Sequence, residues 1–309
     1  PFLLIIFFIF TKKKTRLIYK LDTAEVELGI EYSAGLNKLT WLNNPANVIP
    51  LSAFENRRLI ITSCRKDIAG YYSANGFEIL RMGREAILSF DGNHFEKKKL
   101  KSSIIHGGKY SSTEEAPLNK KNIDKFEQLK KNCALGSLPR LKKFFNDCFI
   151  SGTRLFVQKN ETGEWIAAIL ISFPRTNEAL LNLMLRMKNS LNGAMETLIY
   201  NVFYILKDEG YSRWSLSDVP FIIFKNYVSA KELLFNFTGR RLKYAYNYEG
   251  LYKFKNKFNP VWEDVYLCGS PSVSIRYLLK ISMQSNLLKL AAAGLIKQNN
   301  FIFCREVHK

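Results

Sequence analysis

Stretches in which apolar residues recur at strand spacing alternate along this chain with stretches at helical spacing, and together they predict a mixture of strands and helices. Apolar and polar residues alternate over residues 17–33, as in paired strands with one buried face. Two further apolar runs, at 59–64 and 85–90, are typical of buried strands. Between them, residues 66–74 have helical spacing and stop at an Asn-Gly pair at 75–76, a dipeptide that ends helices. The first third of the chain therefore predicts strands around one helix.

The rest of the chain predicts a longer alternation of helices and strands. Residues 153–173 form two apolar runs joined by turn residues at 160–163, which is typical of a β-hairpin. Residues 194–209 place their apolar side chains on one helical face, and Gly210 follows where glycine often ends a helix. The remaining expected elements are amphipathic helices at 119–133, 138–149, 223–236 and 273–293 and a strand at 213–218.

The order of these elements limits the fold class. A hairpin, then a helix entered through Asn192-Gly193, then a strand is the order of an N-acetyltransferase-like (GNAT) core. Periodicity by itself indicates only an α+β protein. A chain of 309 residues has room for two modest domains or one large one, and 47% hydrophobic residues can fill a packed core.

The charge balance is far from neutral, because 46 Lys and Arg residues stand against 27 Asp and Glu residues, for a net charge of +19. Lysines cluster at 97–101 and again at 120–131. Such an excess favours polyanionic partners, either nucleic acid or the anionic leaflet of a membrane. The alternative is that these lysines form solvated faces without a partner.

Five scattered cysteines, an odd number without C-x-x-C spacing, indicate reduced thiols in a cytosolic setting. The three histidines do not join them in a ligand cluster, so the sequence predicts no metal site. No nucleophile elbow, Walker loop or dinucleotide-binding glycine pattern is present either. The common hydrolase, nucleotidase and dehydrogenase classes therefore have no support.

The first ten residues are all apolar and are followed at once by the basic stretch 12–16. A signal peptide carries its positive charge before the apolar run, and a membrane crossing needs ~20 residues. The order therefore predicts the last part of a transmembrane helix that leaves the membrane on its cytoplasmic side as an exposed stub. The alternative is a buried first strand.

The segment 244–267 is rich in aromatic residues and carries three lysines and one proline. By pattern alone it predicts an amphipathic strand that leads into a Pro-stopped loop. It resembles the string Y-x-F-x-G-L-x-x-F-K-x-K-F-x-P-x-W, the C-terminal signature of the phosphatidylglycerol lysyltransferase (multiple peptide resistance factor) family. The matching residues are Tyr246, Tyr248 in place of the usual Phe, Gly250, Leu251, Phe254, Lys255, Lys257, Phe258, Pro260 and Trp262.

The resemblance covers roughly residues 65–280 and implies two GNAT-like modules in tandem, each with a mixed sheet. Gly76, Gly83, Glu85 and Ala86 stand where the family's first module closes, and a basic helix in 94–110 opens the second, with Lys101 for the usual Arg. The first module is short and is expected to be reduced. The expected boundaries are 1–16 for the end of a transmembrane helix and its basic flank, 17–95 for the reduced first module, 96–280 for the second module, and 281–309 for a C-terminal helix and tail.

Around the central helix the chain departs from the family. The acetyl-CoA loop of true GNAT enzymes is absent, and Asn192-Gly193 precedes the helix instead, either as an ordinary turn or as a source of backbone N–H groups for an anion. In the family pattern D-L-M-R, Asn182 replaces the acidic residue and Leu185 replaces the basic one, although Arg186 stands next to it. An arginine at this place offers a planar phosphate fork.

The resemblance implies that lysine or alanine is transferred from its tRNA ester to a hydroxyl of phosphatidylglycerol, at the cytoplasmic face of the inner membrane. It implies aminoacyl-tRNA, anionic phospholipid and the membrane as partners, with no metal or cofactor. Lys255 and Lys257 are expected to face a cleft and neutralise the lipid phosphate. The candidate catalytic residues are Asn182, Glu196 and Asp218, and the candidate substrate-binding residues are Arg186, Asn192, Gly193, Tyr252, Lys255, Lys257, Phe258 and Trp262.

Two alternatives stay open. The altered D-L-M-R positions are compatible with a non-catalytic basic module that binds lipid or nucleic acid on a degenerate GNAT-like scaffold. The GNAT-like element order is also compatible with another acyltransferase that uses a different donor. The residues do not show which amino acid is transferred.

Overall fold

The computed structural model describes residues 14–21, 24–34, 37–43, 48–49, 51, 58–133, 152–222, 226–241 and 247–293. The expected apolar stub at 1–10, the helix at 138–149 and the tail after 293 lie outside these residues. The chain forms two compact units. The first unit consists of Pro1–Met82 and Asp264–Ser282, and the second consists of Gly83–Glu263 and Met283–Lys309. The sequence instead predicted module boundaries after residues 95 and 280.

The first unit contains a mixed sheet in the strand order β1-β2-β3-β4-β11. Its strands are β1 (Lys14–Leu21), β2 (Ala24–Ala34), β3 (Asn37–Asn43), β4 (Arg58–Cys64) and β11 (Val261–Ser270), the last of which begins in the second unit. Only the pairing of β3 with β4 is parallel among the pairings within this unit that the structure describes. Helix α1 (Lys66–Ala74) follows β4 and has the bounds expected from the sequence.

The core of the first unit lies between α1 and its sheet. Ile68 and Tyr72 of α1 are buried with Leu59 and Ile61 of β4 and Cys268 of β11. The tyrosine hydroxyl donates to the carbonyl of Ile49. Residues 14–16, expected as part of a basic membrane flank, instead begin β1, because Lys14 to Arg16 pair with β2. For these residues the expectation of a flank outside the fold is wrong.

The second unit contains the sheet order β5-β10-β9-β8-β7-β6. Its strands are β5 (Glu78–Ser89), which enters from the first unit, β6 (Ser111–Ala116), β7 (Arg154–Asn160), β8 (Trp165–Arg175), β9 (Glu178–Arg186) and β10 (Arg213–Pro220). β9 and β10 are parallel, and their neighbours in this order pair antiparallel. This is a mixed sheet, and the predicted α+β, GNAT-like fold class is confirmed.

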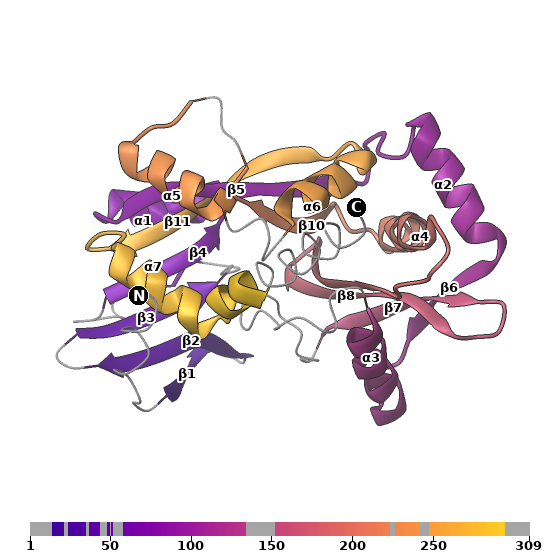
Figure 1. The fold of residues 1–309 in the computed structure, drawn as a ribbon, viewed down its shortest axis with the longest axis horizontal. Coiled ribbons are helices and arrows are strands. Elements are labelled where there is room, and N and C mark those ends of the chain that lie inside the picture. The colour runs from indigo at the N-terminus through magenta and orange to yellow at the C-terminus, as the bar shows by residue number, and fades with distance from the viewer. Residues whose placement is uncertain are drawn as a thin grey trace, which may run out of the picture. The chain divides into compact units, whose positions relative to one another are not determined.

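Several helical segments of the described part of the second unit accompany this sheet. They are α2 (Lys98–Lys109), α3 (Lys120–Asn132), α4 (Ala194–Asp208), α5 (Ala230–Arg241), α6 (Tyr248–Lys255) and the short 3₁₀ helix η4 (Asn256–Phe258). Helix α4 lies across β7 and β8, and α3 covers the opposite face of the sheet (Figure 1). Helix α7 (Ile275–Gln284) follows β11 and lies mostly in the first unit, and residues 287–293 are helical as well.

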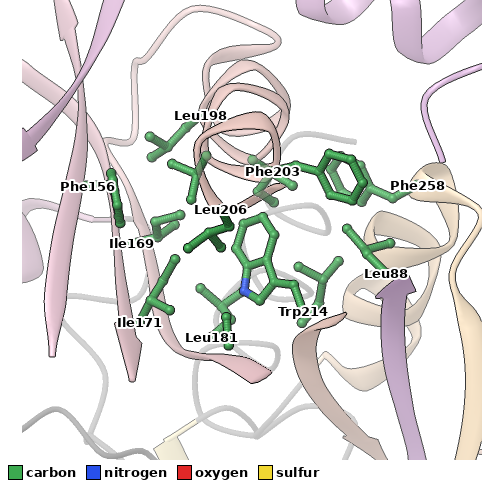
Figure 2. Packing of buried hydrophobic residues seen from close by; sticks show 14 of the residues in the cluster. Leu88, Phe156, Ile169, Ile171, Leu181, Leu198, Phe203, Leu206, Trp214 and Phe258 are labelled. Atoms are coloured by element: carbon green, nitrogen blue, oxygen red, sulfur yellow. The ribbon is translucent and has the colours of Figure 1, made fainter. Parts of the chain in front are cut away.

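The main core of the second unit lies between α4 and the sheet. Trp214 of β10 is fully buried, and its indole lies among Leu206 of α4, Ile171 of β8 and Leu181 of β9 (Figure 2). Burying large apolar side chains such as these is the main source of stability in a domain of this kind. The same cluster includes Phe258 of η4, so the end of the signature segment is anchored in the core.

The signature segment is helical where the pattern predicted a strand, so that prediction is wrong for residues 248–258. Asn247 caps α6 by accepting from the N–H of Gly250 at 2.9 Å. Tyr248 and Lys255, seven residues apart, are both buried on one face of the helix. A cap and a helical face together outweigh the strand propensity of aromatic residues. β11 then begins at Val261, after Pro260.

Two other helices differ from their predicted bounds. The helix expected at 223–236 begins at Ala230. The hydroxyl of Ser229 accepts from the N–H of Glu232 at 3.1 Å, which places the helix start there. The helix expected over 273–293 is interrupted after Gln284, because Asn286 adopts a positive φ of 64° that no helix continues through.

Helices α2 and α4 approach each other closely at two glycines. A Cβ atom on Gly107 would lie 2.5 Å from the carbonyl carbon of Gly193, and one on Gly193 would lie 2.0 Å from the carbonyl oxygen of Ser103. Thr197 also donates its hydroxyl to the carbonyl of Ile104 at 2.9 Å. Because of this contact, α2 covers the backbone at the start of α4.

Gly193→Ala is expected to lower the free energy of unfolding by ~2–4 kcal/mol, because the new methyl group meets backbone at a left-handed φ of 91°. Gly163→Ala is the matched control, since Gly163 has a φ of 79° with nothing within 4 Å of the added carbon. Its cost is expected to be ~1 kcal/mol, from the backbone alone. Urea unfolding of both variants measures the difference, and equal costs would contradict the close approach of α2 and α4.

Candidate active site

The candidate site lies where the parallel strands β9 and β10 separate. They pair only at their beginnings, where Arg213, Trp214 and Ser215 lie opposite residues 178–180. Beyond this point the register of each strand shifts against its other neighbour. β9 shifts against β8 at Asn182, and β10 shifts against β5 between Ser215 and Asp218. Such bulges redirect side chains, and they often occur beside functional sites.

Asn182 occupies the bulge of β9 and is 8% exposed. The hydroxyl of Ser172 on β8 donates to its Oδ1 at 3.0 Å, which fixes the orientation of the amide. Among the residues that the structure describes, its Nδ2 has no acceptor. A buried donor without an acceptor is costly, which sets this amide apart from most buried polar groups in proteins.

The bulge of β10 is held by a network of buried polar groups. Ser217 has a positive φ of 70°, and its N–H donates to Oγ of Ser215 at 2.9 Å. Ser215 in turn donates to the carboxylate of Glu85 on β5 at 2.5 Å. Lys255 of α6 donates from Nζ to the carbonyls of Ser217 and Asp218, both at 3.0 Å. The network therefore joins β5, β10 and α6.

Lys255 is 2% exposed, which is unusual for a lysine. Burial lowers the pKa of its ammonium group from 10.5 to about 8, while the nearby carboxylates of Asp218 and Glu85 oppose this shift. The sequence predicted that Lys255 faces a cleft, and this is wrong, because its ammonium lies in the interior on two backbone carbonyls. Its observed position suits a residue that shapes the β10 bulge.

Glu196 and Lys257 form the second charged group of the site. Glu196 stands in the first turn of α4, and its side chain is 7% exposed. Lys257 of η4 is 48% exposed and donates to Oε1 of Glu196 at 2.8 Å. The carboxylate of Glu196 therefore already binds a lysine ammonium, that of the chain itself. Lys257 also lies 5.4 Å from the centre of the Phe254 ring.

The aromatic residues of the signature segment are in contact with one another. Tyr252 stacks on Trp262 with ring centres 4.7 Å apart, and Phe254 meets Phe258 edge to face at 5.4 Å. Phe258 also packs against Phe95 in the core. Phe258 is fully buried, whereas Tyr252 and Trp262 are half-buried. Phe254 is half-buried as well, so these three rings are partly exposed.

The structure brings some predicted site residues together and separates others. The backbone carbonyl of Asp218 accepts a hydrogen bond from Lys255, and the carboxylate of Glu196 pairs with the ammonium of Lys257. Arg186 and Asn192 are exposed at the ends of β9 and of the turn before α4. Gly193 is buried under α2, which favours the ordinary-turn interpretation over an open anion site. Leu185 is 6% exposed and packs in the cluster that faces α3.

Three residues with a part in this region were not among the predicted site residues. Glu85 and Ser215 form the hydrogen bond beneath the β10 bulge. His94 is buried, and its ring nitrogens lie 3.0 Å from the carbonyl of Asn259 and 2.9 Å from that of Ser89, which ties η4 to the end of β5. The signal for Glu85 was available, because it is a lone carboxylate at the start of the apolar run 85–90.

Within the described ranges, no three His, Cys, Asp or Glu side chains gather as metal ligands do. None of the helices in the described part of the chain is long and apolar enough to cross a membrane. The arrangement consists of a separated pair of parallel strands, two bulges and buried acid–base groups. These features lie on the mixed sheet of an α+β, GNAT-like fold.

The comparisons with known proteins agree with this class. The family model "Phosphatidylglycerol lysyltransferase, C-terminal" matches residues 45–269, so the chain belongs to this family. The phosphatidylglycerol lysyltransferase of Bacillus subtilis (strain 168) is 23% identical over 234 residues, which are 66% of this chain and 25% of that protein. The chain therefore spans about a quarter of this curated relative.

Two solved structures share the fold. L-PGS from Bacillus licheniformis superposes with a TM-score of 0.65 at 20% identity, covering 84% of each chain. The C-terminal domain of a putative lysylphosphatidylglycerol synthetase from Agrobacterium fabrum has a TM-score of 0.60 at 18% identity, over 78% of this chain and 79% of that one. The resemblance seen in the sequence is confirmed.

Proposed function

We propose that this chain transfers an aminoacyl group, lysine or alanine, from aminoacyl-tRNA to a hydroxyl of phosphatidylglycerol at the cytoplasmic face of the inner membrane. Family membership over residues 45–269 supports the lipid acceptor. The observation that carries the proposal is the position of the signature segment. Through Lys255 and Lys257 it joins the β10 bulge to the first turn of α4.

The chemistry requires positioning more than activation. An aminoacyl ester is already reactive, so the lipid hydroxyl attacks its carbonyl carbon and a new ester C–O bond forms. The bond to the tRNA ribose oxygen breaks, and the hydroxyl proton ends on that oxygen. Holding the two substrates in reacting geometry lowers the barrier by removing their relative motion. No oxidant, reductant or metal takes part in this balance.

Asn182 is the group that we assign to the attacking hydroxyl. Its Nδ2 lacks an acceptor among the described residues, and Ser172 holds the amide in place. A donor at this position can bind the oxygen of the lipid hydroxyl and orient it. Lys255 and Ser217 act indirectly, because they hold the bulge of the neighbouring strand.

Glu196 is assigned to an ammonium group of the aminoacyl substrate. It binds the ammonium of Lys257 at 2.8 Å, and this contact supports the assignment. Lys257 is half exposed and can turn toward solvent when a substrate ammonium takes its place. Its charge is then available to the lipid phosphate. Asp218, beside Lys255, is the other candidate for proton transfer.

The remaining predicted residues are assigned to the outer parts of the substrates. Arg186 is exposed next to Leu185 and offers a fork to phosphate, shifted by one position from the family pattern. Tyr252 and Trp262 offer a half-buried aromatic pair for the glycerol and upper acyl chains. Asn192 lies at the exposed turn before α4. The net charge of +19 favours tRNA and anionic lipid together.

Asn182→Leu, which removes the amide without changing side-chain size much, is expected to lower transfer at least tenfold, consistent with the loss of one oriented hydrogen bond of ~1.5 kcal/mol. Asn182→Asp is expected to raise it, because the carboxylate keeps the Ser172 contact and can accept the hydroxyl proton. Transfer kinetics and thermal unfolding are measured together. Unchanged kinetics in both folded variants would remove Asn182 from the site.

A non-catalytic lipid-binding module is the second candidate function. The observation that favours it is the position of Leu185, which lies in the core and offers no cation where the family has arginine. Lipid extraction from cells that express the full-length gene separates the two functions. A ninhydrin-positive derivative of phosphatidylglycerol supports transfer, and vesicle binding without this derivative supports the module.

A further inference from the structure

Helix α5 carries its apolar residues on the side that faces solvent. Leu233, Leu234 and Phe237 are each 50% exposed, and Val228, just before the helix, is 86% exposed. Together with Ala230, the three helical residues follow the spacing of a single helical face. We name Val228, Leu233, Leu234 and Phe237 the α5 apolar face. Clustered exposed apolar residues of this size mark interaction sites, whereas single ones do not.

The opposite side of α5 is already packed. Gly239 is so close to Phe221 that a Cβ atom would lie 2.1 Å from its ring, and Phe235 lies 5.4 Å from the same ring. Glu232 and Asn236 are buried on this side as well. The helix therefore cannot turn its apolar face inward, because its inner face is committed to Phe221.

The charged residues of α5 indicate which kind of partner the apolar face binds. Glu232 is the single carboxylate of the helix, and its Oε2 accepts from the N–H of Val228 at 2.7 Å, so it is buried in the helix cap. At ~100° per residue, Lys231 and Arg240 lie on the two flanks of the apolar face. An apolar face bordered by cations without an exposed carboxylate is typical of a helix that lies in the surface of an anionic membrane.

We propose that the α5 apolar face docks the chain on a bilayer that contains anionic phospholipid, with Leu233, Leu234 and Phe237 in the acyl boundary and Lys231 and Arg240 at the headgroups. The helix that carries this face packs, through its inner side, beside elements of the candidate site. Phe221, which holds α5, directly follows β10 and lies 6.3 Å from Tyr248, the first residue of α6. The proposal rests on the proposed function in taking phosphatidylglycerol as the lipid that the site uses. Vesicle binding tests the docking face separately from transfer.

Vesicle flotation with the full chain tests the docking face. The wild type is expected to float with phosphatidylglycerol vesicles, less so as salt increases, and to stay unbound with phosphatidylcholine vesicles. The double variant Leu233→Ser with Phe237→Ser is expected to lose about a hundredfold in apparent affinity, because two apolar side chains leave the bilayer. Ile105→Ser is the matched control, since Ile105 of α2 is 72% exposed outside this face and should not affect binding.

The single variant Phe237→Ser, with an expected loss of about tenfold, repeats the test if the double variant unfolds. Equal flotation of the wild type and the folded variants would overturn the proposal. A wild-type dimer that becomes monomeric in the double variant would overturn it too, because a second copy would then cover the face.

Transfer to phosphatidylglycerol dispersed in detergent separates this proposal from the proposed function. The double variant is expected to match the wild type in detergent and to lose transfer on vesicles. Impaired transfer in detergent would overturn a pure docking role. If neither the wild type nor the double variant transfers an amino acid but the wild type still floats better, the result supports the docking face and contradicts the transferase proposal.

Discussion

Lys255→Met is expected to lower the free energy of unfolding by ~2–4 kcal/mol at pH 7 and to lower lipid transfer at least tenfold. The ammonium of Lys255 binds the carbonyls of Ser217 and Asp218, and the lysine is 2% exposed. Methionine fills the space but leaves these two acceptors without their donor. The bulge of β10 then loses the hydrogen bonds that hold its shape, and the geometry of the candidate site changes with it.

The pH dependence of this effect follows from the lowered pKa of Lys255, about 8 in the folded chain against 10.5 in the unfolded chain. Below pH 8 the lysine is protonated in both states. Between pH 8 and 10.5 the unfolded chain binds more protons, so stability of the wild type relative to Lys255→Met rises with pH, by up to ~3 kcal/mol.

Urea unfolding at several pH values between 7 and 10.5 measures this difference. Lys253→Met is the matched control, because Lys253 is exposed on the same helix and its loss should change neither stability nor its pH dependence. A stability difference between the wild type and Lys255→Met that stays constant over this range would contradict the burial of a titrating ammonium at this place.

Leu185→Arg is expected to destabilise the chain by ~3–5 kcal/mol, although arginine is the residue of the family pattern at this position. Leu185 is 6% exposed and lies in an apolar cluster with Phe126 and Leu129 of α3 and Leu170 of β8. A guanidinium group there would be buried without a carboxylate. Restoring the family residue therefore costs stability in this chain.

Chemical unfolding of Leu185→Arg measures the loss, and Leu185→Met is its control because it conserves volume and should cost less than ~1.5 kcal/mol. Arg186→Lys tests the neighbouring position. It should leave stability unchanged and weaken transfer, since Lys lacks the planar fork. A stable and more active Leu185→Arg protein would contradict the placement of Leu185 in the core.

The elements with local signals could be predicted from the sequence. The Asn-Gly pair at 75–76 predicted the end of α1, and the turn residues 160–163 separate β7 from β8 as expected. Helix α4, Ala194–Asp208, follows Gly193 and stops before Gly210, as its glycines indicated. In each case the signal and the structure lie within a few residues of each other.

The elements that depend on distant partners could not be predicted in this way. β6, with the sequence SSTEEA, has no apolar alternation, and its strand conformation comes from pairing with β7. The signature segment has aromatic residues that favour strands, but the cap at Asn247 and the buried face of Tyr248 and Lys255 make it helical. Tertiary contacts decided both outcomes.

The sequence named individual candidate residues but did not predict which of them contact each other. Glu196 and Lys257 were both predicted, yet their ion pair joins residues 61 positions apart in the chain. Lys255 was predicted as an open phosphate contact, because its burial depends on the β10 bulge, which no local pattern reveals. The donor on Asn182 became visible only through the hydrogen bond from Ser172 on the adjacent strand.

The most direct test of the central proposal is a transfer assay with radiolabelled lysyl-tRNA or alanyl-tRNA and phosphatidylglycerol vesicles. After solvent extraction, we expect label in the lipid phase, dependent on both tRNA ester and phosphatidylglycerol, with more label from one of the two amino acids. Label that stays in the aqueous phase with folded, vesicle-bound protein would contradict aminoacyl transfer and leave the chain a lipid-binding module.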